Sequence, residues 1–91
     1  MRRLPLDEPM VLDANAVAGE LAEMMGVDIT AYLARCAHCG NRDAIGSLRA
    51  WTRGPGVVLR CVVCSEIVIR WVRTPTGPRV DLRGAAFLQP R

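Results

Sequence analysis

Cys36-Ala-His-Cys39-Gly40 opens the part of the sequence that decides the fold, and Cys61-Val-Val-Cys64 closes it. Each stretch supplies two thiols from one tight turn, and 21 residues separate the two pairs. Four thiolates in this pattern are the usual ligands of a closed tetrahedral zinc site, with zinc–sulfur distances of about 2.3 Å. The sequence therefore predicts one structural Zn²⁺ with four ligands: Cys36, Cys39, Cys61 and Cys64.

Two other uses of the four cysteines remain as alternatives. Iron in a rubredoxin-like site is disfavoured because such sites carry glycine after both cysteine pairs and several aromatic side chains. Here Ser65 follows the second pair, and the chain has few aromatic residues. A thiol redox protein is disfavoured because a working C-x-x-C motif begins a helix, which neither pair is expected to do. His38 is expected to lie beside the ligands or in solvent.

The ligand set also argues against catalysis. Four thiolates leave no open coordination position for water or substrate. The sequence contains no nucleophile–base pair, no Walker-type glycine loop and no H-E-x-x-H helix. We therefore expect a non-enzymatic protein without a small-molecule substrate.

Alternating apolar and polar residues predict four strands, at residues 48–53, 57–60, 66–73 and 79–83. The long strand 66–73 is expected to bury Ile67, Ile69 and Trp71 on one side. Residues 27–35 are expected to form a short strand or an extended link. These elements predict an antiparallel sheet of three or four strands that carries two C-x-x-C knuckles, which is a zinc ribbon.

An amphipathic helix is predicted over residues 13–25, before the ribbon. Asp13 suits the N-cap position, and Gly26 suits the left-handed residue that ends a helix. The predicted fold class is therefore small α+β, a zinc ribbon preceded by one N-terminal helix. The expected organisation is an arm at residues 1–11, a single domain at 12–84 with its ribbon at 34–84, and a C-terminal tail at 85–91.

The 91 residues suit one domain with a small hydrophobic core, so we expect the bound metal to supply part of the stability of the fold. The first residues lack the apolar stretch of a secretory signal, and charged residues interrupt every apolar run that could span a membrane. Free cysteines persist in reducing compartments. We expect a cytoplasmic protein without membrane contact.

Charge is unevenly distributed along the chain. Residues 1–34 carry a formal charge of −4, residues 35–91 carry +7, and every basic residue is Arg. A basic half suits RNA or DNA, but it also suits docking of the acidic half of the same chain. The residues expected to form a nucleic-acid-binding face are Arg49, Trp51, Arg53, Arg60 and Arg70.

Two alternatives compete with this face. Trp51 and Trp71 can instead be the packing anchors of a core that is poor in aromatic residues. An unidentified protein partner, or a second copy of the chain, can bind the apolar stripe of the helix, and this adaptor or regulator role is slightly preferred. The residues expected to form the protein-binding surface are Val17, Leu21, Met24 and Phe87.

The chain also resembles a small uncharacterised zinc-ribbon family of actinobacteria. The resembling segments are Leu12-Asp13-Ala-Asn15-Ala16, Cys36-Ala-His-Cys39-Gly40, Pro55-Gly56-Val-Val-Leu59-Arg60-Cys61 with Cys64, and Asp81-Leu82-Arg83-Gly84. The resemblance covers residues 11–84. It implies a ribbon fold and bound zinc, and it implies no particular activity.

Overall fold

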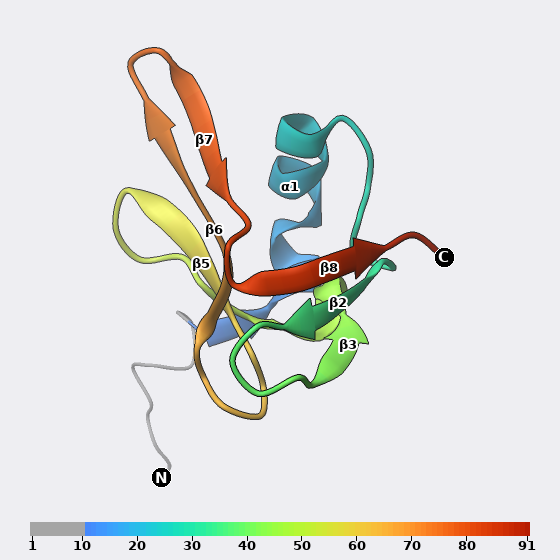
Figure 1. Cartoon of the computed structure of the whole chain (residues 1–91). Coiled ribbons are helices and arrows are strands. Elements are labelled where there is room, and N and C mark those ends of the chain that lie inside the picture. The colour runs from blue at the N-terminus through green and yellow to red at the C-terminus, as the bar shows by residue number, and fades with distance from the viewer. Residues whose placement is uncertain (1–10) are drawn as a thin grey trace, which may run out of the picture.

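Eight strands in two antiparallel sheets and one α-helix make up the computed structural model, which describes residues 11–91 (Figure 1). The larger sheet has the order β1 (Val11–Asp13), β4 (Arg49–Trp51), β5 (Gly56–Arg60), β6 (Ile67–Thr74) and β7 (Gly77–Asp81). The smaller sheet has the order β3 (Arg42–Ala44), β2 (Leu33–Cys36) and β8 (Ala85–Gln89). The predicted class, small α+β with one helix and antiparallel strands, is confirmed. The predicted arm, apart from Val11, lies outside the described residues.

The segment predicted as a helix begins as a 3₁₀ helix, η2 (Ala14–Val17), and continues as α1 (Ala18–Met25). The Asp13 carboxylate accepts a hydrogen bond at 3.1 Å from a backbone N–H two residues later and so caps the first turn. Gly26 ends α1 in the left-handed conformation, with φ of 81°. A second 3₁₀ helix, η3 (Ile45–Ser47), precedes β4. No helix within residues 11–91 is long and apolar enough to cross a membrane.

The prediction of one sheet with three or four strands is wrong, because the structure has a five-stranded sheet and a separate three-stranded sheet. The four predicted strands correspond to β4, β5, β6 and β7, with bounds that differ by up to two residues. β1 and β3 were missed because neither lies in an alternating stretch, whereas the three residues of β4 lie within the alternating stretch 48–53. The segment 27–35 is a strand only from Leu33 onward, where β2 begins.

The C-terminal segment 85–91 is part of the fold, which corrects its prediction as a tail. Ala85–Gln89 forms β8 and pairs with β2, with Phe87 opposite Arg35 and Leu88 opposite Ala34. The run Ala-Ala-Phe-Leu has no alternation, and its partner strand is distant in the sequence, so no local pattern indicates this pairing. The pairing matters for the cysteines because β2 ends at the first of them.

The core lies between the helix and the inner face of the larger sheet. Leu21 of α1 is 0 % exposed and Trp71 of β6 is 1 % exposed. The indole N–H of Trp71 donates a hydrogen bond to Glu20 Oε2 at 2.7 Å and ties the helix to the sheet. Trp71 is therefore a packing anchor. The inner face consists of two cross-strand rows: Ala50, Leu59 and Ile69, and Val57, Trp71 and Val80.

Val68 departs from the alternation of β6, which predicts it on the exposed side with Arg70. It is buried, and the pairing of β5 with β6 shifts register beside it. The backbone of Gly84 passes close by, because a Cβ on Gly84 would overlap the carbonyl oxygen of Ile67. The Gly84 carbonyl also accepts a hydrogen bond at 2.8 Å from the N–H of Ala37. This crossing covers Val68 and joins the two sheets beside the first cysteine pair.

Candidate functional site

The four cysteine sulfurs lie within 4.8 Å of one another where the two sheets meet. Cys36 ends β2 of the smaller sheet, and Cys61 follows β5 of the larger one. The Sγ atoms of Cys36 and Cys64 are 3.6 Å apart, and those of Cys39 and Cys61 are 3.7 Å apart. Sulfurs placed 2.3 Å from a tetrahedral metal are about 3.8 Å from one another. The cluster therefore fits a metal ion with four thiolate ligands.

The two C-x-x-C turns have matching backbone hydrogen bonds. The N–H two residues after the first cysteine points at its sulfur at 3.4 Å, from His38 to Cys36 and from Val63 to Cys61. The N–H four residues after each first cysteine donates to its carbonyl oxygen, at 2.9 Å in the first turn and 3.0 Å in the second. Amide hydrogens aimed at sulfur favour the ionised thiolate, which is the form that binds a metal.

A left-handed residue closes each turn. Gly40 has a φ of 80°, and Ser65 at the equivalent position has a φ of 67°. Ser65 is the one residue other than glycine with a positive φ in the described part of the chain. Because Ser65 adopts the conformation of a glycine, its presence does not by itself distinguish zinc from iron.

The thiols differ in acidity. Burial opposes ionisation of Cys36, but the N–H groups of Cys39 and His38 outweigh it and lower the pKa of this thiol to about 7. At Cys64 the N–H of Glu66 favours the thiolate, but burial and the neighbouring thiols raise the pKa to about 12. A divalent metal ion would therefore find one acidic thiol and would displace protons from the others as it binds.

Polar side chains lie beside the two turns. His38 is exposed, and its Nε2 lies 3.9 Å from Glu66 Oε1, beyond hydrogen-bond distance. A guanidinium N–H of Arg60 donates to the carbonyl oxygen of Ser65 at 2.9 Å and supports the second turn. His38 lies outside the four-sulfur cluster.

The outer face of the larger sheet carries a row of arginines. The strand register places Arg49 of β4 directly opposite Arg60 of β5. Like charges directly opposite each other repel, but Asp13 of β1 lies directly opposite Arg49 on its other side, and the Arg60 guanidinium contacts Ser65 and Trp51. The neighbouring row across four strands consists of Trp51, Val58, Arg70 and Asp81.

Two arginines that were not predicted as site residues join this face. Arg79 of β7 lies opposite Val72, and Arg83 follows β7. Their alternation with Asp81 is visible in the sequence, but only the pairing of β7 with β6 brings them beside Arg70. The resulting basic face combines all five predicted nucleic-acid-binding residues with these two: Arg49, Trp51, Arg53, Arg60, Arg70, Arg79 and Arg83.

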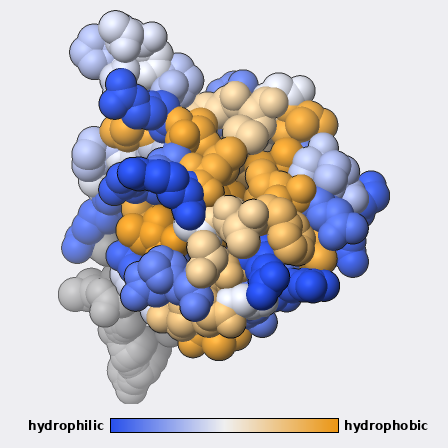
Figure 2. Space-filling view, viewed as in Figure 1, coloured by the Kyte–Doolittle hydropathy of each residue, from blue (hydrophilic) through white to orange (hydrophobic). Residues whose placement is uncertain are grey.

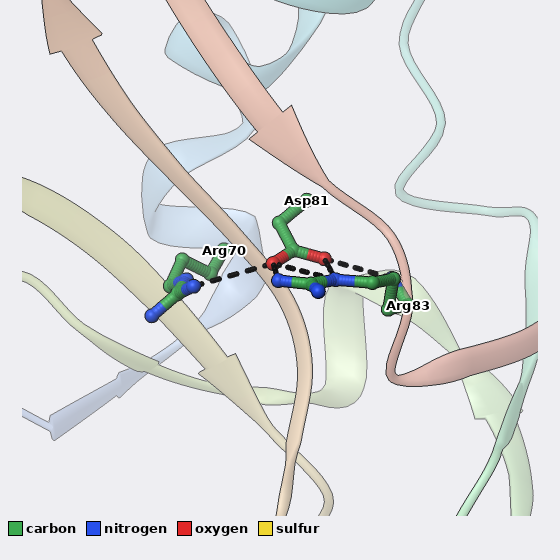
Figure 3. A network of polar contacts seen from close by, with 3 residues as sticks. All are labelled: Arg70, Asp81 and Arg83. Carbon is green, nitrogen blue, oxygen red and sulfur yellow. Dashed lines mark hydrogen bonds and ion pairs between the residues drawn. The ribbon is translucent and has the colours of Figure 1, made fainter.

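Asp81 holds two of these arginines in place (Figure 3). Its Oδ2 accepts hydrogen bonds from Arg83 Nη2 at 2.6 Å and from Arg70 Nη2 at 3.2 Å. The side-chain and backbone hydrogen bonds from Arg83 hold the pKa of Asp81 well below its usual value. The carboxylate therefore stays ionised at neutral pH, and the three side chains together carry a positive charge.

A hollow of about 490 Å³ lies in the basic face, and its lining combines arginines with apolar residues that include two valines. A second hollow of about 230 Å³ shares Arg70, Asp81 and Arg83 with the first and reaches His38 beside the cysteines. The face is therefore concave as well as positively charged. The first hollow is lined in part by Arg53, Val58, Arg70, Val72, Arg79 and Arg83.

The residues predicted to bind a protein serve mainly within the fold. Leu21 is fully buried, and Val17 and Met24 pack against the core. Phe87 is half-buried on β8, with the Arg42 guanidinium carbon 5.7 Å from its ring centroid. Figure 2 shows apolar side chains over α1 and β8, whereas hydrophilic side chains gather over β5 and β7 at the left of the view. The centre of the predicted stripe is thus inaccessible to a partner.

Comparison with known protein families identifies a match over most of the chain. A model of a family of unknown function (DUF6510) matches residues 7–91. No curated protein and no solved structure matches the chain. The match confirms the expectation that the chain belongs to an uncharacterised family.

Proposed function

Since this chain belongs to the DUF6510 family, a family of unknown function, we propose its role from its own geometry. It is a non-enzymatic cytoplasmic module in which one structural Zn²⁺ holds the fold together and the basic face binds nucleic acid. The four sulfurs support the first part of this proposal, and the arginines of the larger sheet support the second.

The mutual distance of the four sulfurs, all within 4.8 Å, carries the zinc proposal. Four thiolates in a tetrahedral arrangement suit Zn²⁺ or iron among the common metals. Such a site has no open position for a substrate, so the ion is structural. It joins β2 of one sheet to β5 of the other.

Protein isolated from its native cells is expected to be colourless and to contain one zinc ion per chain. Elemental analysis measures the stoichiometry, and an absorption spectrum detects iron, which colours a tetrathiolate site. The Cys36→Ser variant is the control, because loss of one of four ligands should abolish retention of the ion. A coloured protein with one iron per chain would contradict the choice of zinc and would favour a rubredoxin-like redox protein.

An excess of positive charge on the outer sheet face carries the nucleic-acid proposal. Six arginines lie on or beside this face, and the two carboxylates in its rows, Asp13 and Asp81, are both engaged. Asp13 caps the helix, and Asp81 binds Arg70 and Arg83. Arg49 is exposed beside Arg60 on this face, so its guanidinium is accessible to a phosphate.

Binding of a labelled oligonucleotide is expected to weaken steeply as salt rises from about 50 to 200 mM, because bound phosphates release counterions. Arg79→Gln should lower the slope of log K against log salt by about 0.7 to 0.9, the value for one phosphate contact. Arg42→Gln is the matched control, since Arg42 is an exposed strand arginine of the smaller sheet. Equal slopes for both variants and the parent protein would exclude the basic face as the binding surface, and fluorescence anisotropy measures them.

Binding of a protein partner or self-association through the helix is the less favoured proposal. Its central residue, Leu21, is buried in the core. Affinity that barely responds to salt would favour such an apolar interface over the basic face.

A further inference from the structure

Trp51 distinguishes the basic face from a merely charged surface. Its side chain is 40 % exposed, although Trp71 on the other side of the sheet is 1 % exposed. The guanidinium carbon of Arg60 lies 5.8 Å from the Trp51 ring centroid, within the range of a cation–π contact. An exposed indole held by a guanidinium offers a rigid surface on which a nucleic-acid base can stack.

The described helices do not suit reading of a duplex. A helix that enters the major groove presents basic and amide side chains to the base edges. α1 has eight residues, carries Glu20, and is tied through Glu20 to Trp71 on the inner face of the sheet. It therefore lies on the side opposite the basic face. The bases of a duplex are stacked on one another, so Trp51 can contact a base face only in an unpaired strand.

The two hollows adjoin the cross-strand row of Trp51, because Arg70 and Asp81 of that row line both of them. Trp51 and Arg70 are in the same row, separated by one strand and hence by about 10 Å. Arg70, Asp81 and Arg83 form the wall that both hollows share. Because Asp81 already orders the two guanidiniums, less side-chain freedom is lost when a phosphate binds.

We propose that the basic face binds single-stranded nucleic acid, with a base stacked on Trp51 and adjacent phosphates in the hollows beside Arg70 and Arg83. This inference rests on the proposed nucleic-acid function and adds the strand state and the stacking residue. The bound nucleic-acid strand crosses the larger sheet from the β4 side, past Arg70, toward His38. Sequence preference is expected to be weak, because stacking and phosphate contacts read no base edges.

Anisotropy titrations of zinc-loaded protein with a short labelled oligouridine, and with a DNA duplex of the same length, test this inference. Single strands are expected to bind more tightly than the duplex. Trp51→Ala should weaken single-strand binding about 5- to 150-fold, the loss typical of one stacked base, and should weaken duplex binding far less. Trp51→Phe keeps a stacking ring and should recover most of the affinity. Zinc content and the thermal transition of each variant establish that it is folded.

The outcomes separate this inference from the function on which it rests. Equal affinity for both probes, with no loss in Trp51→Ala, would overturn single-strand stacking and leave nucleic-acid binding by the arginines intact. Absence of binding to either probe at low salt would overturn both. Loss of single-strand binding in Trp51→Ala with recovery in Trp51→Phe supports the stacking role, because a purely electrostatic face would respond to neither variant.

Discussion

Removal of the proposed metal ion, by chelation or by Cys61→Ser, is expected to abolish the cooperative thermal transition of this protein. Binding of zinc to a tetrathiolate site contributes about 10 to 16 kcal/mol at neutral pH, which is comparable with the total stability of a domain, about 5 to 15 kcal/mol. The cysteines connect β2 to β5, and the two sheets meet at them. Without the ion, four free thiols remain in a partly buried cluster, and nothing replaces the four metal–sulfur bonds.

Circular dichroism on heating, with and without a chelator, measures this effect. Val63→Ser is the matched control, because it places serine in the same turn at a side chain that is 65 % exposed and is not a ligand. The control variant should keep the parent transition and one bound ion. A full, unshifted transition in the chelated protein would show that the fold does not depend on the metal.

Trp71→Ala is expected to cost about 3 to 5 kcal/mol of unfolding free energy, the range for loss of a large aromatic side chain from a core. This amount is a large share of the stability of a small domain. Trp71 fills the inner row between Val57 and Val80, so the cavity would lie under the centre of the sheet. The variant also removes the indole N–H that donates to Glu20 Oε2, so α1 and β6 lose one of their contacts.

Urea denaturation of the zinc-loaded protein measures the loss. Trp51→Ala is the control for removal of an indole from an exposed site, and it should change the unfolding free energy far less. Trp71→Phe should lie between the two, because the ring remains but the hydrogen bond to Glu20 is lost. Similar losses for Trp51→Ala and Trp71→Ala would contradict the assignment of Trp71 as the core anchor and Trp51 as a surface residue.

Several local features could be predicted because their causes lie within a few residues. The residue type and spacing of the two cysteine pairs predict that they form one cluster. The cap preferences of Asp13 and Gly26 predict where the helical segment begins and ends. The alternation of Ile69, Arg70 and Trp71 indicates correctly which side of β6 is buried. Strict alternation fails at Val68, because the backbone of Gly84 crosses there from a distant part of the chain.

The sequence by itself determined the cysteine cluster, a helical segment that Asp13 caps and Gly26 ends, and the strands that lie in extended alternating stretches. The tertiary structure decided the rest: the strand formed by residues 85–89, the opposition of Arg49 and Arg60, and the gathering of Arg79 and Arg83 beside Arg70. The physical reason is that cross-strand neighbours are set by pairing and register between distant segments. Those depend on which apolar faces can be buried together, a property of the whole chain rather than of any local stretch.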